Sequence, residues 1–294
     1  MTGERDSSLL KGYGLVFGLF GLLIVDLAII VGILSLILGP RFFEGFVTGK
    51  LSQSETVLYV SLLYFLVLAT ITLYWKRVSG DNVASTGLCA SGGSLRGFAQ
   101  GALLGAGAFM TYFGIMLALR LVTTSPPADA GHCTVNGLFM GRLLMDSLAV
   151  YAIAITEEYM FRGVVLRLFM RHGPVVHAIV ATNVLFAACH MFGHMAPAIK
   201  VLYFITLVLL GSALSVAALR TGRLWYPIGF HGTLIFLSMI KDTFGVLKIL
   251  PGPYAFLYGL GGHAMAGVFS IALFAACLAL VSTIRPLEEH TDGS

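Results

Sequence analysis

Charged residues are scarce in this sequence. Of 294 residues, 11% are charged and 57% are apolar, whereas a soluble domain carries about 25% charged residues. A larger core cannot explain the deficit, because a soluble surface would still need charge. Mean hydropathy is +0.91, so we expect lipid to surround most of the chain. A modest net charge of +4, placed between the apolar runs, also excludes a nucleic-acid-binding protein.

Motifs that would indicate metal or redox chemistry are also missing. The four cysteines form no C-x-x-C pair, so they indicate neither a zinc site nor a redox motif. No H-E-x-x-H motif occurs. We therefore expect the cysteines to be small apolar residues; they are Cys89, Cys133, Cys189 and Cys277.

Long continuous apolar runs replace the missing charge. Backbone polar groups in lipid must pair within their own segment, and the runs do not alternate as barrel strands would, so we predict an all-α, polytopic transmembrane helix bundle. A span needs about 20 apolar residues. About eight spans are expected, near residues 13–38, 57–75, 97–119, 138–171, 174–193, 200–219, 225–246 and 259–284.

The spans suggest three regions. They are an N-terminal three-span region at 1–137, a core at 138–246, and a last span with a short polar tail at 247–294. Eleven Lys and Arg residues fall on one side of the predicted bundle and seven on the other, which favours both termini in the cytoplasm. With no retention or transit signal visible, we expect a prokaryotic plasma membrane.

Ionisable residues inside the apolar runs are candidate functional residues, because a charge at the bilayer centre costs about 3 kcal/mol or more. Asp26 has no predicted partner. A transporter that couples protons through Asp26 or Glu157 is one alternative, but the paired repeats of many transporters are not visible. The intramembrane candidates are Asp26, Asp146, Glu157, Glu158, His190, His194, His231, Lys241 and His263.

Two adjacent carboxylates form the most informative segment. On a helix, Glu157 and Glu158 point about 100° apart, so they should have different roles. Glu158 lies four residues before Arg162, the favourable order for an ion pair. Glu157 has no local partner, and a carboxylate in apolar surroundings can act as a general base. The plainer interpretation is that both glutamates bind a basic loop at the membrane surface.

Depth along the helices links Glu157 to a histidine. At ~1.5 Å per residue from the basic turn at Arg171, Glu157 lies ~21 Å and His190 ~24 Å into the bundle. Phe186 stands one turn before His190 on the same face. By the same count, His231 lies only ~10 Å into the bundle from a Trp-Tyr pair. Its position alone predicts an interfacial histidine.

Three motifs occur in order along residues 138–246. They are Glu157-Glu158-x-x-x-Arg162, then Phe186-x-x-x-His190, then His231 at the end of R-T-G-x-L-W-x-P-I-G-x-H. Together they resemble the CPBP family, the CAAX proteases and bacteriocin-processing or Abi proteins, which includes type II CAAX prenyl endopeptidases. The first three spans carry no such motif.

The resemblance implies an eight-helix intramembrane protease of the glutamic type without a cofactor. In that scheme Glu157 and His190 activate a water molecule that attacks a peptide carbonyl, and His231 helps to stabilise the oxyanion. Glu158 and Arg162 support the site. The substrate would be a membrane-anchored protein or peptide, cleaved near its anchor or at a leader or C-terminal segment.

One position departs from the family pattern. The family usually has Asn or Asp four residues after the second histidine, where this chain has Ile235. Loss of one oxyanion donor typically costs about 10²–10³ in rate. His194 and Asn183 are candidate substitutes. The isoleucine also leaves open a non-catalytic scaffold or immunity protein that binds a membrane peptide, and a zinc site at His190, His231 and a glutamate is a further alternative.

Overall fold

The structure is a computed structural model that describes residues 2–90, 93–124, 137–191, 195–244 and 247–285. It confirms an all-α membrane bundle. Four helical segments are long and apolar enough to cross a membrane: Ser7–Leu38, Leu58–Ser79, Ser94–Ala118 and Pro197–Thr221. Two shorter apolar helices accompany them. The chain is therefore an integral membrane protein.

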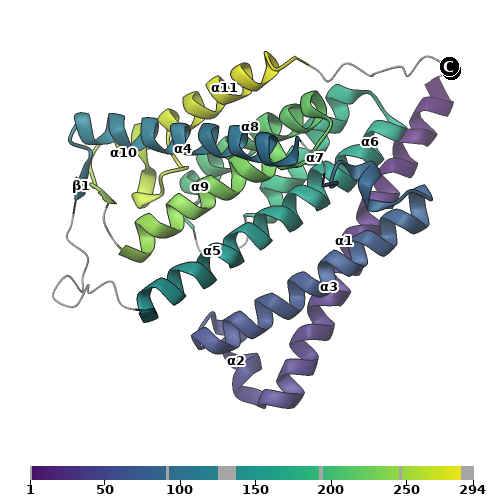
Figure 1. The fold of residues 1–294 in the computed structure, drawn as a ribbon, viewed down its shortest axis with the longest axis horizontal. Coiled ribbons are helices and arrows are strands. Elements are labelled where there is room, and N and C mark those ends of the chain that lie inside the picture. The colour runs from purple at the N-terminus through teal and green to yellow at the C-terminus, as the bar shows by residue number, and fades with distance from the viewer. Residues whose placement is uncertain (1, 91–92, 125–136, 192–194, 245–246, 286–294) are drawn as a thin grey trace.

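The N-terminal helices form an arm that projects from the rest of the bundle toward the bottom of Figure 1. Helix α1 (Thr2–Leu38) ends at Gly39, whose φ of 86° favours glycine, and Pro40 then begins α2 (Pro40–Thr48). Helix α3 (Gln53–Ser79) starts with a capping box between Ser52 and Glu55 and returns along α1.

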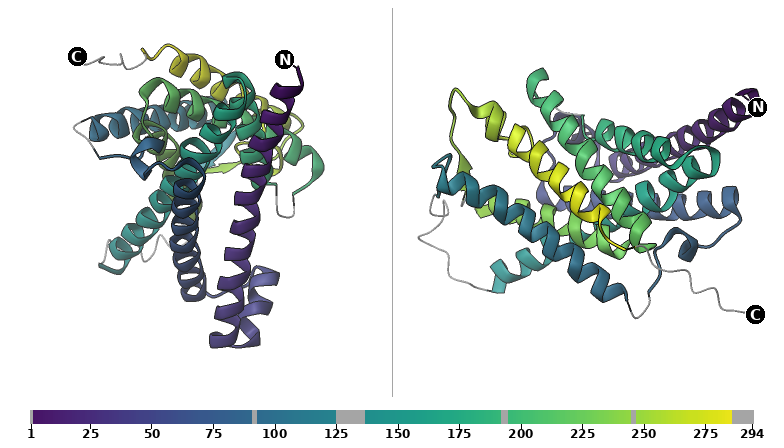
Figure 2. Two further views of the ribbon diagram at one scale, coloured as in Figure 1. Left: turned by 90° about the vertical axis from the view of Figure 1, so that its right-hand side faces the viewer. Right: turned by 90° about the horizontal axis from the view of Figure 1, so that it is seen from above.

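Helices α8 and α9 organise the rest of the bundle (Figures 1 and 2): α8 contacts α7, α9 and α11, and α9 contacts α4 and α5. In chain order the elements are the 3₁₀ turn η1 (Val83–Thr86), α4 (Ser94–Ala118), β1 (Val122–Thr124), α5 (Gly137–Glu158), the π-helical segment η2 (Tyr159–Val165), α6 (Leu166–His172), α7 (Val175–Cys189), α8 (Pro197–Thr221), α9 (Trp225–Phe244), β2 (Leu247–Ile249), α10 (Ala255–Tyr258), the 3₁₀ turn η3 (Leu260–Gly262) and α11 (Val268–Ser282).

Each predicted span contains a helix, but two details differ. The last helix begins at Val268 rather than near 259, because Gly259, Gly261 and Gly262 have positive φ values of 152°, 65° and 82° that end helical geometry. The sequence also gave no sign of the antiparallel strand pair, in which Val122 of β1 faces Ile249 of β2.

Helices α4 and α9 make the most extensive contact in the bundle because glycines let their backbones meet. A Cβ atom at Gly101 of α4 would collide with the Tyr226 carbonyl oxygen, and one at Gly105 would lie 2.6 Å from the Phe230 carbonyl oxygen. From the other side, a Cβ at Gly229 would collide with the Phe98 carbonyl oxygen. This contact fixes α9, which carries His231.

Candidate active site

The two glutamates stand where one long helix changes its winding. Helix α5 ends at Glu158 and continues directly as the π-helical segment η2. Such wider turns occur mostly as short insertions in α-helices and are frequent at functional sites. Arg162 lies inside η2 and is fully buried. The chain therefore places a carboxylate pair and a guanidinium within one helical segment.

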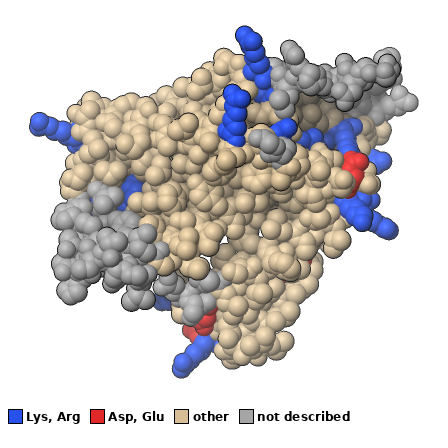
Figure 3. All heavy atoms as spheres, viewed as in Figure 1, with Lys and Arg blue, Asp and Glu red and all other residues tan. Residues whose placement is uncertain are grey.

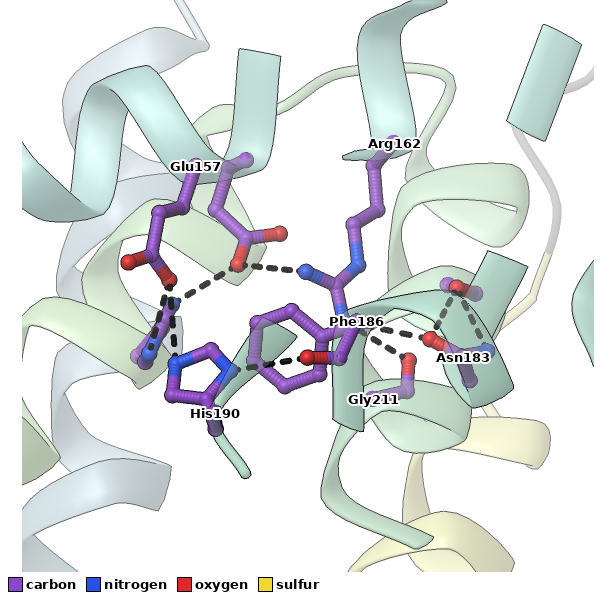
Figure 4. A network of polar contacts seen from close by, with 9 residues as sticks. Glu157, Arg162, Asn183, Phe186, His190 and Gly211 are labelled. Atoms are coloured by element: carbon purple, nitrogen blue, oxygen red, sulfur yellow. Dashed lines mark hydrogen bonds and ion pairs between the residues drawn. The ribbon is translucent and has the colours of Figure 1, made fainter. Parts of the chain in front are cut away.

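Glu158 is the centre of a buried network that includes Arg162, which Figure 4 labels. Its Oε1 atom accepts hydrogen bonds from Arg162 Nη1 at 3.0 Å and from His231 Nδ1 at 2.8 Å. The side chains of Glu158 and Arg162 are both 0% exposed. The structure thus forms the ion pair that the four-residue spacing predicts, and adds an imidazole that the spacing alone could not show.

Two neighbouring helices hold the other side of the guanidinium. Arg162 Nη2 donates to Asn183 Oδ1 of α7 at 3.3 Å and to the Gly211 carbonyl oxygen of α8 at 3.2 Å. Asn183 in turn bonds to Ser215 and to the Ile179 carbonyl oxygen. A Cβ at Gly211 would lie 2.5 Å from Asn183 Oδ1, so the glycine makes room for this network.

The ring of Phe186 supports both imidazoles and the guanidinium. Arg162 Cζ lies 4.5 Å from its centroid. The centroids of His190 and His231 lie 4.7 Å and 5.9 Å from it. Phe186 is fully buried, so its ring is a fixed apolar surface against which the guanidinium and both imidazoles pack.

Glu157 faces both imidazoles. Its Oε2 atom lies 3.9 Å from His190 Nε2 and 4.0 Å from His231 Nε2. These separations are too long for direct hydrogen bonds, but a water that bridges two atoms by bonds of ~2.8 Å holds them roughly 4–4.6 Å apart. The separations are therefore close to that of a water-bridged contact, and Oε2 is buried with no hydrogen-bond partner among the described residues.

Partners on the far side of each ring orient the two imidazoles. His190 Nδ1 lies 2.8 Å from the Phe186 carbonyl oxygen, and His231 Nδ1 faces the Glu158 carboxylate. Carbonyl and carboxylate oxygens only accept, so each Nδ1 carries a proton and donates. Both Nε2 atoms are thereby turned toward Glu157. A carboxylate that faces two oriented imidazoles can take part in acid–base chemistry.

An apolar cavity of about 350 Å³ opens beside this carboxylate and its imidazoles. Glu157, His190 and His231 form its polar wall, while residues such as Phe274 from α11 form the apolar walls. Ile235 also lines it, at the position where the sequence departs from the family pattern. The site can therefore hold an apolar group next to an acid and two imidazoles.

The predicted supporting residues have different outcomes. Asn183 holds Arg162 but does not line the cavity, so it is not the oxyanion donor that the sequence made a candidate. His194 lies outside the described residues. Asp26 is buried, and its Oδ2 atom has no hydrogen-bond partner among the described residues.

The predicted shallow position of His231 was wrong. The residue is 5% exposed and reaches Glu157 and Glu158. The depth estimate failed because it took the first turn of α9 to be uncovered. The segment after α3 covers it: the Leu224 amide donates to the Gly87 carbonyl oxygen, and Trp225 Nε1 donates to the Cys89 carbonyl oxygen.

Sequence reasoning missed two further features of the site. Gly211 matters through the side chain it lacks, and glycines in apolar helices are too common to single it out. Tyr203 lines the cavity, yet it belongs to no motif in the sequence.

Within the described ranges, no group of three or more His, Cys, Asp or Glu residues could hold a metal ion. The zinc alternative stays a prediction for chelators to test.

Comparison with known protein families identifies the centre of the chain. Residues 139–237 match the family model described as type II CAAX prenyl endopeptidase Rce1-like. The chain has an Rce1-like core. This core runs from α5 to α9 and contains Glu157, His190 and His231. The resemblance to the CAAX protease family is thereby confirmed. Comparisons with curated proteins and with solved structures found no match.

Proposed function

We propose that the chain is an intramembrane endopeptidase that hydrolyses a peptide bond near a membrane anchor. The observation that carries the proposal is one carboxylate oxygen of Glu157 about 4 Å from the Nε2 atoms of two imidazoles, at the polar wall of an apolar cavity. The Rce1-like core belongs to a protease family, which agrees with this chemistry.

In the first step, Glu157 and His190 position a water molecule between them. The Glu157 carboxylate takes one proton from the water. The water oxygen attacks the carbonyl carbon of the scissile bond, and the carbonyl oxygen becomes an oxyanion. The Glu157 carboxyl then gives this proton to the departing amide nitrogen as the C–N bond breaks. A positioned base of this kind contributes about 10²–10⁴ in rate.

His231 stabilises the oxyanion in this scheme. Its Nδ1–H is committed to Glu158, so His231 donates from Nε2 only when both ring nitrogens carry protons. The charges at the site accommodate this imidazolium: two carboxylates and the Arg162 guanidinium leave one negative charge, which one added proton neutralises. Glu158 and Arg162 therefore act as positioning residues for His231.

Tyr203 supplies the second donor that Ile235 cannot. Tyr203 lines the same cavity as Glu157, His190 and His231. Its hydroxyl forms no hydrogen bond with any other described residue, so it is available to a ligand. By contrast, the Tyr112 hydroxyl, also on the cavity wall, already donates to backbone carbonyl oxygens.

The apolar cavity indicates the substrate class. Its walls select an apolar side chain or anchor next to the scissile bond, and the family description makes a prenylated C-terminal peptide the first probe. A leader peptide and a C-terminal sorting segment are the further candidates. The expectation of a prokaryotic plasma membrane with both termini in the cytoplasm belongs to this proposal and favours the latter two substrates.

Cleavage of defined membrane peptides tests the proposal. The full chain, reconstituted in liposomes, is given quenched fluorogenic peptides of three kinds: S-farnesylated C-terminal, leader-like and single-span. Glu157→Gln keeps the shape of the side chain but removes the base. The variant should therefore cleave the peptide that wild type cleaves at least about 100-fold more slowly. Glu44→Gln, on an exposed glutamate of α2, is the matched control and should cleave normally.

Ile235 favours a second candidate function. An isoleucine on the cavity wall suits a protein that binds a membrane peptide without hydrolysing it. In that case wild type and Glu157→Gln would bind the same peptide equally, neither would release product, and the enzyme proposal would fail.

A further inference from the structure

A second polar region lies at the end of the bundle where α6 meets α1 and α3. Figure 3 shows Lys and Arg side chains gathered there around one acidic group. The cations that line cavities at this end are Lys11 of α1, and Arg167 and Arg171 of α6. Asp81 is the carboxylate that pairs with Arg171, at 2.5 Å. None of these residues contributes to the candidate active site.

Both tryptophans of the chain mark this end as a membrane interface. Trp75 Nε1 donates to Ser85 Oγ, and Trp225 Nε1 donates to the Cys89 carbonyl oxygen, so both side chains bind the same short segment between α3 and α4. Trp is enriched at the level of lipid headgroups, where its apolar ring and its polar N–H are both satisfied. The basic end therefore lies where headgroups lie.

Two cavities adjoin at this level and share Arg171. One, of about 270 Å³, is lined by Trp75, Ser85, Arg167, Met170 and Arg171. The other, of about 340 Å³, is lined by Lys11, Leu15, Val78, Leu168, Arg171 and His172. We call them together the basic double cavity. It combines cations with apolar wall residues, as a lipid headgroup and the start of its acyl chains would require.

Among the described side chains, only Asp81 offsets the cations of the basic double cavity. Arg167 forms no ion pair with any described residue, and its buried Nε atom has no hydrogen-bond partner among them. Arg171 is held in place by Asp81 and by the Trp75 ring, whose centroid lies 4.7 Å from its Cζ. Counted over the described side chains, three cations and one carboxylate leave two positive charges at the cavities.

The pKa of His172 reflects the positive charge around the basic double cavity. Burial lowers its pKa, and the charges of Lys11 and Arg171 lower it further. Its Nδ1 atom lies 3.3 Å from the Ser8 hydroxyl of α1, which is a neutral partner. An anion placed between Lys11 and Arg171 would relieve this repulsion.

We propose that the basic double cavity binds the phosphate group of an anionic membrane lipid. The planar guanidinium of arginine matches phosphate oxygens in a forked geometry, and basic pockets between membrane helices on the cytoplasmic side bind such headgroups. Because the lipid would bridge Lys11 of α1 with Arg167 and Arg171 of α6, it stabilises the packing of the N-terminal arm against the Rce1-like core. The proposal does not depend on proteolysis.

Thermal unfolding of the full chain in a neutral detergent tests the proposal. Dioctanoyl-phosphatidylglycerol should raise the Tm, whereas dioctanoyl-phosphatidylcholine and inorganic phosphate at equal concentration should raise it little. Arg167→Gln should weaken phosphatidylglycerol binding about fivefold, since one cation near a headgroup is worth roughly 1 kcal/mol. Arg41→Gln, on the exposed tip helix α2, removes the same charge elsewhere and should bind as wild type does.

Several results would overturn the proposal. Equal Tm shifts with the two lipids would show that binding does not depend on the charge of the headgroup. A shift with inorganic phosphate as large as with phosphatidylglycerol would show an anion site rather than a lipid site. Equal loss in Arg167→Gln and Arg41→Gln would show a general effect of net charge. If Arg167→Gln does not fold, Lys11→Gln, on an exposed side chain, gives the same comparison.

Discussion

Breaking the buried Glu158–Arg162 pair should cost far more stability than removing both partners together. Arg162→Met leaves the Glu158 carboxylate 0% exposed without its cation, and leaves Asn183 Oδ1 and the Gly211 carbonyl oxygen without their donor. Truncating one partner of a buried pair costs about 3–5 kcal/mol. Glu158→Gln should cost a similar amount, because Arg162 then keeps an uncompensated charge.

The double variant removes both charges at once. Glu158→Gln with Arg162→Met puts a neutral amide and an apolar side chain in the same volume, so its cost should be smaller than the sum of the single costs by about 2–3 kcal/mol. Equilibrium unfolding in mixed micelles, followed by circular dichroism, measures the three free energies of unfolding relative to wild type.

An exposed ion pair of the same chain serves as the comparison. Asp81 and Arg171 are 43% and 42% exposed, and a pair in contact with water couples by only about 0.2–1 kcal/mol. The reasoning is refuted if the costs of Glu158→Gln and Arg162→Met simply add, or if their coupling is no larger than that of Asp81→Asn with Arg171→Met. Either result would mean that the network around Glu158 is solvated.

Three further predictions concern packing and catalysis. Gly101→Ala should destabilise the fold by about 1–3 kcal/mol, because its Cβ meets the backbone of α9. The control is Gly107→Ala on the same helix, whose Cβ meets nothing within 4 Å. This variant should be neutral or slightly stabilising in the same unfolding assay. Ile235→Asn should raise the cleavage rate by restoring an oxyanion donor on the cavity wall; an unchanged rate would contradict that role. Tyr203→Phe should lower kcat about 10-fold or more with little change in KM, and a change confined to KM would make Tyr203 a binding residue only.

The local parts of the site could be predicted from the sequence. The Glu158–Arg162 pair follows from a four-residue spacing, and the common depth of Glu157 and His190 follows from counting residues from one tight turn. Both inferences use the regular geometry of helices. They hold because α5, η2, α6 and α7 follow one another in the chain. Two helices joined by a tight turn are antiparallel neighbours, so the depth of their residues can be counted along each helix from that turn.

The parts that depend on distant segments could not be predicted. His231 was expected near the surface, yet residues such as Gly87 and Cys89 cover the start of α9 and place it inside the bundle. The Gly211 carbonyl oxygen binds Arg162 from another helix, and no pattern in the sequence pairs them. Helix α11 starts late because of positive φ angles at glycines, which an apolar run conceals.

The central claim is that Glu157 and His190 act together on one water molecule. The most direct measurement is the single-turnover cleavage rate of Glu157→Gln, His190→Gln and the double variant in liposomes. Residues that act as a unit are strongly non-additive, so the double variant should be no more than a few-fold slower than the slower single variant. Rate losses that multiply would show that the two side chains act independently and would contradict the shared site.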